Sequence, residues 1–240
     1  MEEVGTIPGD NQAMYDKICR SVVRLVCYEP ARPDKPKFTI PGVIAMSGSD
    51  YCYIIALRDA HVWSSIGPFE VILPDGAKMK LQKKEVETRL NLMAFYFYVS
   101  TSAFMKSVEF SMDAISLNEE VFTFGFGAPM LSCEISPGRV THERQFSFSH
   151  DSPPSIHTSS GDLVFNKQAE FVGISYKDLG VTIALSVESI TKLLSLFHKN
   201  MEGKSLSEIL QHIDVQAKSH KKRKKDGLAK SHTKRKKKSH

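Results

Sequence analysis

The chain has 240 residues, of which 41% are hydrophobic and 25% are charged. This length allows one or two domains with a sizeable core, and the composition excludes a membrane protein. The formal net charge of +5 is unevenly distributed, because residues 218–240 carry +11, which leaves −6 for the rest of the chain.

No apolar segment is long enough to cross a bilayer, and the first ten residues lack the basic and apolar regions of a secretory signal. We therefore expect the protein to stay inside the cell, with no membrane partner. The four cysteines have no spacing typical of zinc ligands. We expect them to be free, buried thiols in a reducing compartment, and we expect no metal and no cofactor.

The first half of the chain is rich in short apolar or alternating runs. We expect a flexible N-terminus over residues 1–15 and a short helix over the stretch NQAMYDKICR (11–20). Turn signals such as SGSD and PDG then separate the predicted strands, which lie at residues 21–28, 37–46, 51–57, 69–73, 77–87 and 92–99.

Short apolar or alternating runs appear again after residues 101–116, which separate the two halves of the chain. Strands are predicted there at residues 120–126, 132–141, 162–166, 170–176 and 181–186. Because no helical pattern lies between the strands, a parallel sheet is excluded. We predict an all-β protein made of two antiparallel six-stranded β-barrels, the first over residues 16–102 and the second over residues 103–186.

Helical periodicity appears only near the C-terminus. We expect helices within residues 187–218, formed by SVESITKLLSLFHK (186–199) and SLSEILQHIDVQAK (205–218). The second helix opens with Ser205-x-x-Glu208, the pattern of a capping box. Residues 219–240 have no apolar periodicity, and we expect a disordered basic tail.

Several segments resemble trypsin-like serine proteases of the HtrA/Deg type, in the order of that family. The stretch PGVIAMSGSDYCYIIALRDAHV delivers His61 at a strand end, in an Ala-His-Val context. VFTFGFGAPMLSCEISPGRVTHER (121–144) resembles the family's Gly-rich turn and its Gly-x-Val-Ser strand. SIHTSSGDLVFNKQAEFVGISY (155–176) resembles the nucleophile region, and VTIALSVESITKLL (181–194) resembles the closing strand and helix. The resemblance covers about residues 20–195.

This resemblance implies a triad with His61 as general base, Asn91 at the acid's position and Ser159 as nucleophile. The backbone amides of the oxyanion hole are then those of His157, Thr158 and Ser159. If the loop is one residue shorter, Ser160 is the alternative nucleophile. His150 and His157 flank this loop, and we expect both at the surface.

The implied site departs from the family pattern at the acid and at the nucleophile loop. Asn91 has no charge with which to stabilise an imidazolium. In this family's Ser-His-Asp template, the same exchange lowers turnover by about 10⁴. The loop keeps only Gly161 of three glycines, and Asp162 replaces a proline. These departures favour an impaired catalyst that binds an extended peptide in the cleft between the barrels, and a weak endopeptidase using Ser159 and His61 is the alternative.

The tail resembles a bipartite nuclear import signal. Its two basic clusters are Lys221, Lys222, Arg223, Lys224 and Lys225, and Lys234, Arg235, Lys236, Lys237 and Lys238. An exposed run of this kind fits an acidic receptor groove. We expect a nuclear import receptor as partner, and localisation in the nucleus or nucleolus. In the alternative function, the barrels are a scaffold whose tail binds nucleic acid nonspecifically by releasing counterions.

Overall fold

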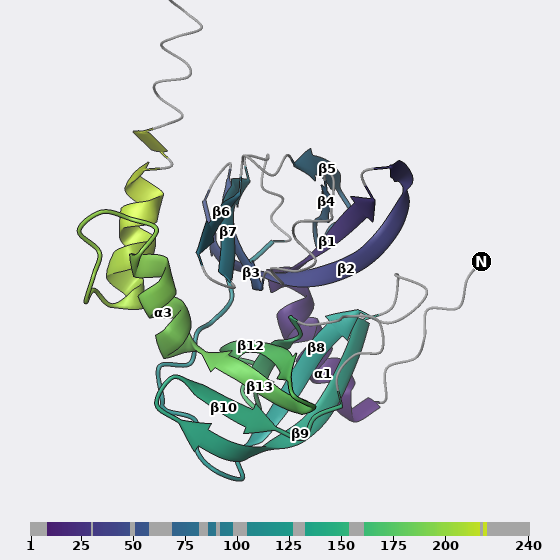
Figure 1. Ribbon diagram of the computed structural model, residues 1–240, viewed down its shortest axis with the longest axis vertical. Coiled ribbons are helices and arrows are strands. Elements are labelled where there is room, and N and C mark those ends of the chain that lie inside the picture. The colour runs from purple at the N-terminus through teal and green to yellow at the C-terminus, as the bar shows by residue number, and fades with distance from the viewer. Residues whose placement is uncertain are drawn as a thin grey trace, which may run out of the picture.

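The protein consists of two β-sheet units joined by a linker and followed by helices (Figure 1). The computed structural model describes residues 9–29, 31–48, 51–57, 69–81, 86–89, 92–97, 105–126, 133–153, 161–216 and 218–219. The fold below refers to these residues.

The first unit is an antiparallel sheet in the order β5-β4-β1-β2-β3-β7-β6. The sequence predicted six strands closed into a barrel, whereas the described residues form seven strands in an open half-barrel. Among these residues, β5 pairs only with β4 and β6 only with β7, so the two edges of the sheet do not meet. The strands are β1 (Val22–Glu29), β2 (Arg32–Ser47), β3 (Cys52–Leu57), β4 (Phe69–Ile72), β5 (Lys78–Leu81), β6 (Glu87–Arg89) and β7 (Leu92–Phe97).

The second unit is a closed six-stranded barrel in the order β10-β13-β12-β11-β8-β9, as predicted. Its inward-facing side chains include Val121, Val140 and Phe148, which are all buried. The prediction missed β10. The strands are β8 (Glu120–Phe126), β9 (Cys133–Arg144), β10 (Ser147–His150), β11 (Leu163–Asn166), β12 (Phe171–Asp178) and β13 (Val181–Ser186).

Two helices occupy the C-terminal region, as the periodicity predicted. Helix α3 (Val187–Ser195) begins where the Ser186 side chain accepts a hydrogen bond from the Ser189 amide. The second helical segment, residues 206–216, is preceded by the predicted capping box. There the Ser205 hydroxyl accepts from the Glu208 amide at 3.3 Å, and the Glu208 carboxylate accepts from the Ser205 amide at 2.9 Å. The box satisfies two backbone donors that a helix start leaves unpaired.

An N-terminal helix, α1 (Gly9–Ile18), packs on the second unit and is followed by a 3-10 turn, Cys19–Ser21. Tyr15 stacks on Phe124 of β8, with ring centroids 6.3 Å apart. The helix starts inside the segment 1–15, for which we expected flexibility, because its apolar side, including the buried Met14, joins the core.

One apolar core joins both units and the C-terminal helices. It contains Val43 and Tyr53 of the first sheet, Ile174 of the second, and Ile209 and Ile213 of the last helix. The linker also bonds to both units, since the Val108 amide donates to Ile44 and the Phe171 amide donates to Glu109. The two sheets are therefore held in one packed body.

Candidate functional site

Every residue of the predicted triad and oxyanion hole lies outside the described residues. These are His61, Asn91, His157, Thr158, Ser159 and the alternative nucleophile Ser160. The ten basic residues of the predicted import signal, at 221–225 and 234–238, also lie outside them. The structure does describe the residues that adjoin the three triad segments.

The residues adjoining the predicted triad lie together, between the two units. Strand β3 ends at Leu57, four residues before His61, and β7 begins at Leu92, directly after Asn91. These two residues are partners in the β3–β7 pairing. Gly161, which follows the Ser159-Ser160 pair, lies against the same strand: a Cβ placed on it would be 3.5 Å from the Cβ of Leu57. The described residues nearest to the three predicted triad positions thus lie close together.

Gly161 and Asp162 fix the chain that leaves the predicted nucleophile loop. Gly161 has a φ of +104°, which a residue with a side chain adopts only at a cost, and it is the glycine that this loop retains. Its amide donates to the Ser175 carbonyl at 2.7 Å, and the Ser175 amide donates to the Asp162 carbonyl at 2.8 Å. Asp162, in the position of the family's proline, is buried.

Strand β12 has a backbone edge beside this point with which none of the described strands pairs. Backbone groups alternate in direction along a strand, so those of Lys177 face the same side as those of Ser175, away from β13. Strand β11 begins only at Leu163, opposite Ile174. Within the described part of the chain, no strand pairs with this edge of β12 beyond Ser175. An extended peptide can add to such an edge through main-chain hydrogen bonds.

His150 is buried, and the expectation that it lies at the surface is wrong. Its side chain points to the same side of β10 as Phe148, with ring centroids 6.2 Å apart, and only 4% of the residue is exposed. Neither ring nitrogen has a hydrogen-bond partner among the described residues. Burial lowers the pKa of His150 to about 4, against an opposing effect of Asp151. The ring is therefore neutral at physiological pH.

The four cysteines are free thiols, as expected, and two of them are fully buried. Burial raises the pKa of Cys52 to about 12, and it also raises the pKa of Cys19 and of Cys133. Cys19 and Cys133 are only partly buried, which differs from the expectation. A raised pKa disfavours the thiolate that a cysteine nucleophile requires.

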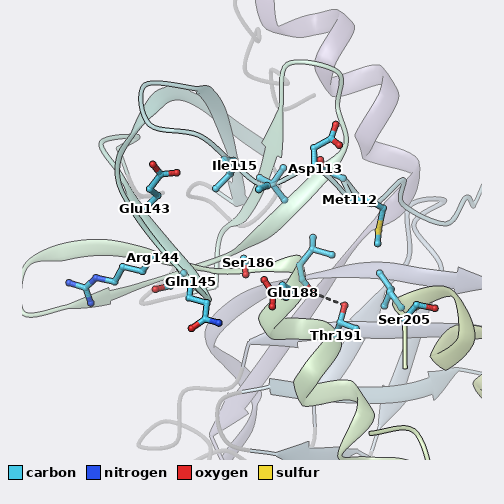
Figure 2. Close-up of a pocket in the computed structure, with 16 residues that line it drawn as sticks. Met112, Asp113, Ile115, Glu143, Arg144, Gln145, Ser186, Glu188, Thr191 and Ser205 are labelled. Atoms are coloured by element: carbon cyan, nitrogen blue, oxygen red, sulfur yellow. Dashed lines mark hydrogen bonds between the residues drawn. The ribbon is translucent and has the colours of Figure 1, made fainter. Parts of the chain in front are cut away.

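A cavity of about 690 Å³ lies away from the triad segments (Figure 2). It is formed by residues 111–115 of the linker, the β9–β10 turn, the start of α3 and Ser205 with Leu206. Figure 2 shows Glu188 and Thr191 on α3, where Thr191 donates to the Val187 carbonyl at 2.8 Å, while Arg144 extends away from the helix. Sequence reasoning missed this cavity because five separate segments build it, the fifth being Val172 of β12.

The described residues also bear on metal binding and on membrane crossing. No group of three or more His, Cys, Asp or Glu side chains among them is placed to hold a metal ion. None of the helices in this part of the chain has the length and apolar character needed to cross a membrane.

The paired β units and the meeting of the three segments between them define a protein with the trypsin-like serine-protease fold. A crystal structure of the serine endoprotease from Yersinia pestis is similar to this chain, with a TM-score of 0.63. The similarity covers 82% of this chain and 70% of that one, at 16% sequence identity. No family model matches the sequence, and no curated protein matches it.

Proposed function

We propose that the protein is a nuclear pseudoprotease, in which the cleft of a trypsin-like fold binds an extended peptide without cleaving it. The edge of β12 beside Gly161 carries this proposal, because Gly161 lies against Leu57 of β3, which pairs with Leu92 of β7. Main-chain pairing needs no triad. Binding can therefore persist where catalysis is lost.

The loss of catalysis is argued from the residues at the predicted site. Asn91 cannot supply the negative charge that stabilises a protonated His61, which removes about 5 kcal/mol of transition-state stabilisation in the family's template. The loop before Gly161 lacks the glycines that let backbone amides turn toward an oxyanion. Each departure alone slows the reaction, and both affect the same step.

A pair of substitutions at Lys177 tests peptide binding at the β12 edge. Lys177→Pro removes the edge amide without removing a bond to β13, whereas Lys177→Ala keeps that amide and changes only the side chain. We would screen fluorescein-labelled dodecapeptides with the full-length protein and measure affinity by fluorescence anisotropy. Proline should weaken binding about tenfold, the effect of one lost hydrogen bond of about 1.4 kcal/mol, and alanine should leave it unchanged.

Circular dichroism must show that both variants fold. Equal binding by the Pro and Ala variants would remove β12 from the proposal. The absence of any binding peptide in the library would refute the peptide-binding function itself.

A fluorophosphonate probe tests whether catalysis is lost. Such probes label an activated serine, so the folded protein should stay unlabelled under conditions in which trypsin reacts completely. Labelling that disappears in Ser159→Ala, or in Ser160→Ala, would establish the alternative, a weak endopeptidase, and would identify its nucleophile. Asn91→Asp is the matched gain-of-function variant, since it should raise any trace activity steeply.

The nuclear part of the proposal depends on the two basic clusters of the tail. Deleting residues 219–240 from a fluorescently tagged copy should move the protein to the cytoplasm. A scrambled tail of the same composition, with the lysines dispersed, separates the two expected partners. It should lose nuclear import, because an import receptor reads clustered side chains, but it should keep nonspecific nucleic-acid binding, which depends on total charge. Nuclear accumulation of the scrambled protein would favour nucleic-acid retention over receptor-mediated import.

A further inference from the structure

A second cavity, of about 380 Å³, lies where α1, β1, the β4–β5 turn and the β8–β9 strands meet. Figure 1 shows α1 beside β8 in this region. Leu57, Leu92 and Gly161, which adjoin the predicted triad, do not line it. Its volume is within the range of small-molecule sites in proteins.

Of the two described cations that line this cavity, Arg24 on strand β1 is the more buried. Its guanidinium carbon lies 4.5 Å from the ring centroid of Phe126, a cation–π distance. The Nε of Arg24 is buried and has no hydrogen-bond partner among the described residues. No aspartate or glutamate from this part of the chain lines the cavity. Arg24 as a whole is half-buried, and a partly desolvated charge with no carboxylate beside it in the described part of the chain is stabilised by a bound anion.

The other polar side chains of the cavity carry protons. Burial raises the pKa of Tyr15 to about 12, and it raises the pKa of Cys19 and of Cys133. Lys78 at the β4–β5 turn adds an ammonium group. The Tyr15 hydroxyl, the Cys133 thiol and the two cations are hydrogen-bond donors, whereas the Cys19 thiol donates to the Asp16 carbonyl at 3.7 Å. This lining suits an acceptor group with negative charge and is unfavourable for a cation.

The remaining wall is apolar and includes two phenylalanine rings. Tyr15 stacks on Phe124, and Phe124 meets Phe126 edge to face at 5.8 Å. Arg24 thus lies at the end of a row of three rings, which we call the aromatic row. Ile72 and Leu73 line the cavity as well. A ligand that fits has one anionic end and one apolar end.

We infer that this cavity binds a carboxylate attached to an apolar body, with the carboxylate on Arg24 and the body on the aromatic row. Guanidinium groups bind carboxylates through two parallel hydrogen bonds, which favours this head group. The carboxylate comes either from a small organic acid or from the C-terminus of a polypeptide that ends in an apolar residue. The inference is independent of the function proposed for the β12 edge.

Calorimetric titration of the full-length protein tests the inference with matched probes. The small-acid pair is 4-phenylbutyrate and its neutral analogue 4-phenylbutanol. The peptide pair is acetyl-Ala-Ala-Phe with a free carboxylate and with a C-terminal amide. In at least one pair, the acid should bind at least tenfold more tightly than the neutral analogue, because only the acid makes charge-assisted bonds. The pair that shows the difference identifies the source of the carboxylate.

Arg24→Met removes the charge at nearly constant length, and it should lower the affinity for the acid to that of the neutral probe. Arg24→Lys keeps the charge but cannot form two parallel hydrogen bonds. Its affinity for the acid should therefore lie between those of the wild type and Arg24→Met. Arg144→Met, on the exposed β9–β10 turn, is the control and should bind like the wild type.

Equal affinities for acid and neutral probes in the wild type would overturn the inference, whether or not the variants fold. Failure of all four probes to bind would also overturn it. So would an Arg24→Met protein that folds normally and keeps its preference for the acid.

Discussion

The buried ring of His150 predicts a loss of stability in mild acid. In the folded protein, burial lowers the pKa of this histidine to about 4, whereas its ordinary value is 6.5. The unfolded chain therefore takes up the proton first as the pH falls. The contribution of a neutral His150 is fully present above pH 6.5 and is lost progressively between 6.5 and about 4.

The size of the effect follows from the difference between the two pKa values. Within that window, each pH unit removes up to about 1.4 kcal/mol. At about pH 5 the stability should be about 2 kcal/mol lower than at about pH 8 because of this residue alone. Carboxyl groups elsewhere in the protein also change protonation as the pH falls. The effect of His150 is therefore measured by comparing variants.

Urea unfolding followed by circular dichroism at several pH values gives the measurement. His150→Leu keeps an apolar side chain of similar size and removes the titration, so it should lose less stability than the wild type on acidification. His142→Leu, at an exposed position on β9, is the matched control and should follow the wild type. If His150→Leu has the same pH dependence as the wild type, the neutral buried ring is the wrong description of this site.

Two further predictions concern packing and helix formation. Gly138→Ala should lower the free energy of unfolding by about 1–3 kcal/mol, since the added Cβ would lie 2.6 Å from the Cα of Ser152, where the backbone has to shift. If Gly138→Ala unfolds in urea like the wild type, the backbone at Ser152 moves aside without cost, and this prediction is wrong. Ser205→Ala should cost about 1 kcal/mol by removing the hydroxyl that accepts from the Glu208 amide. Ser207→Ala, in the exposed first turn of the same helix, is the control, and equal losses in both variants would refute the role of the cap.

Sequence patterns predicted most of the strands because burial on one face imposes alternation. The two errors have physical causes. Strand β10 was missed since its Ser-Phe-Ser-His sequence carries too few apolar side chains, and its pairing with β9 and β13 stabilises it instead. The predicted strand 77–87 is in fact β5 and β6, at opposite edges of the first sheet, a separation that local sequence does not encode.

The candidate site was predictable in outline only. The family resemblance named three segments, and their meeting depends on the pairing of Leu57 with Leu92 and on the approach of Gly161, which are contacts between distant parts of the chain. The cavity at Arg24 had one sequence signal, an arginine within the apolar run SVVRLVCY. Its ring partner Phe126 lies about a hundred positions further on, so the sequence could not indicate the cavity around it.

The last helix holds the two sheets together, because all three share one apolar core. Tyr51 of the first unit donates a hydrogen bond to Asp214 in the last helix, while Leu206 and Ile209 of that helix pack in the same core as the second barrel. Neither β unit can be separated from the rest without exposing apolar surface that the shared core buries. We therefore expect truncations at the seam, or after α3, to yield insoluble fragments instead of working halves, and the intact chain to melt in a single cooperative step.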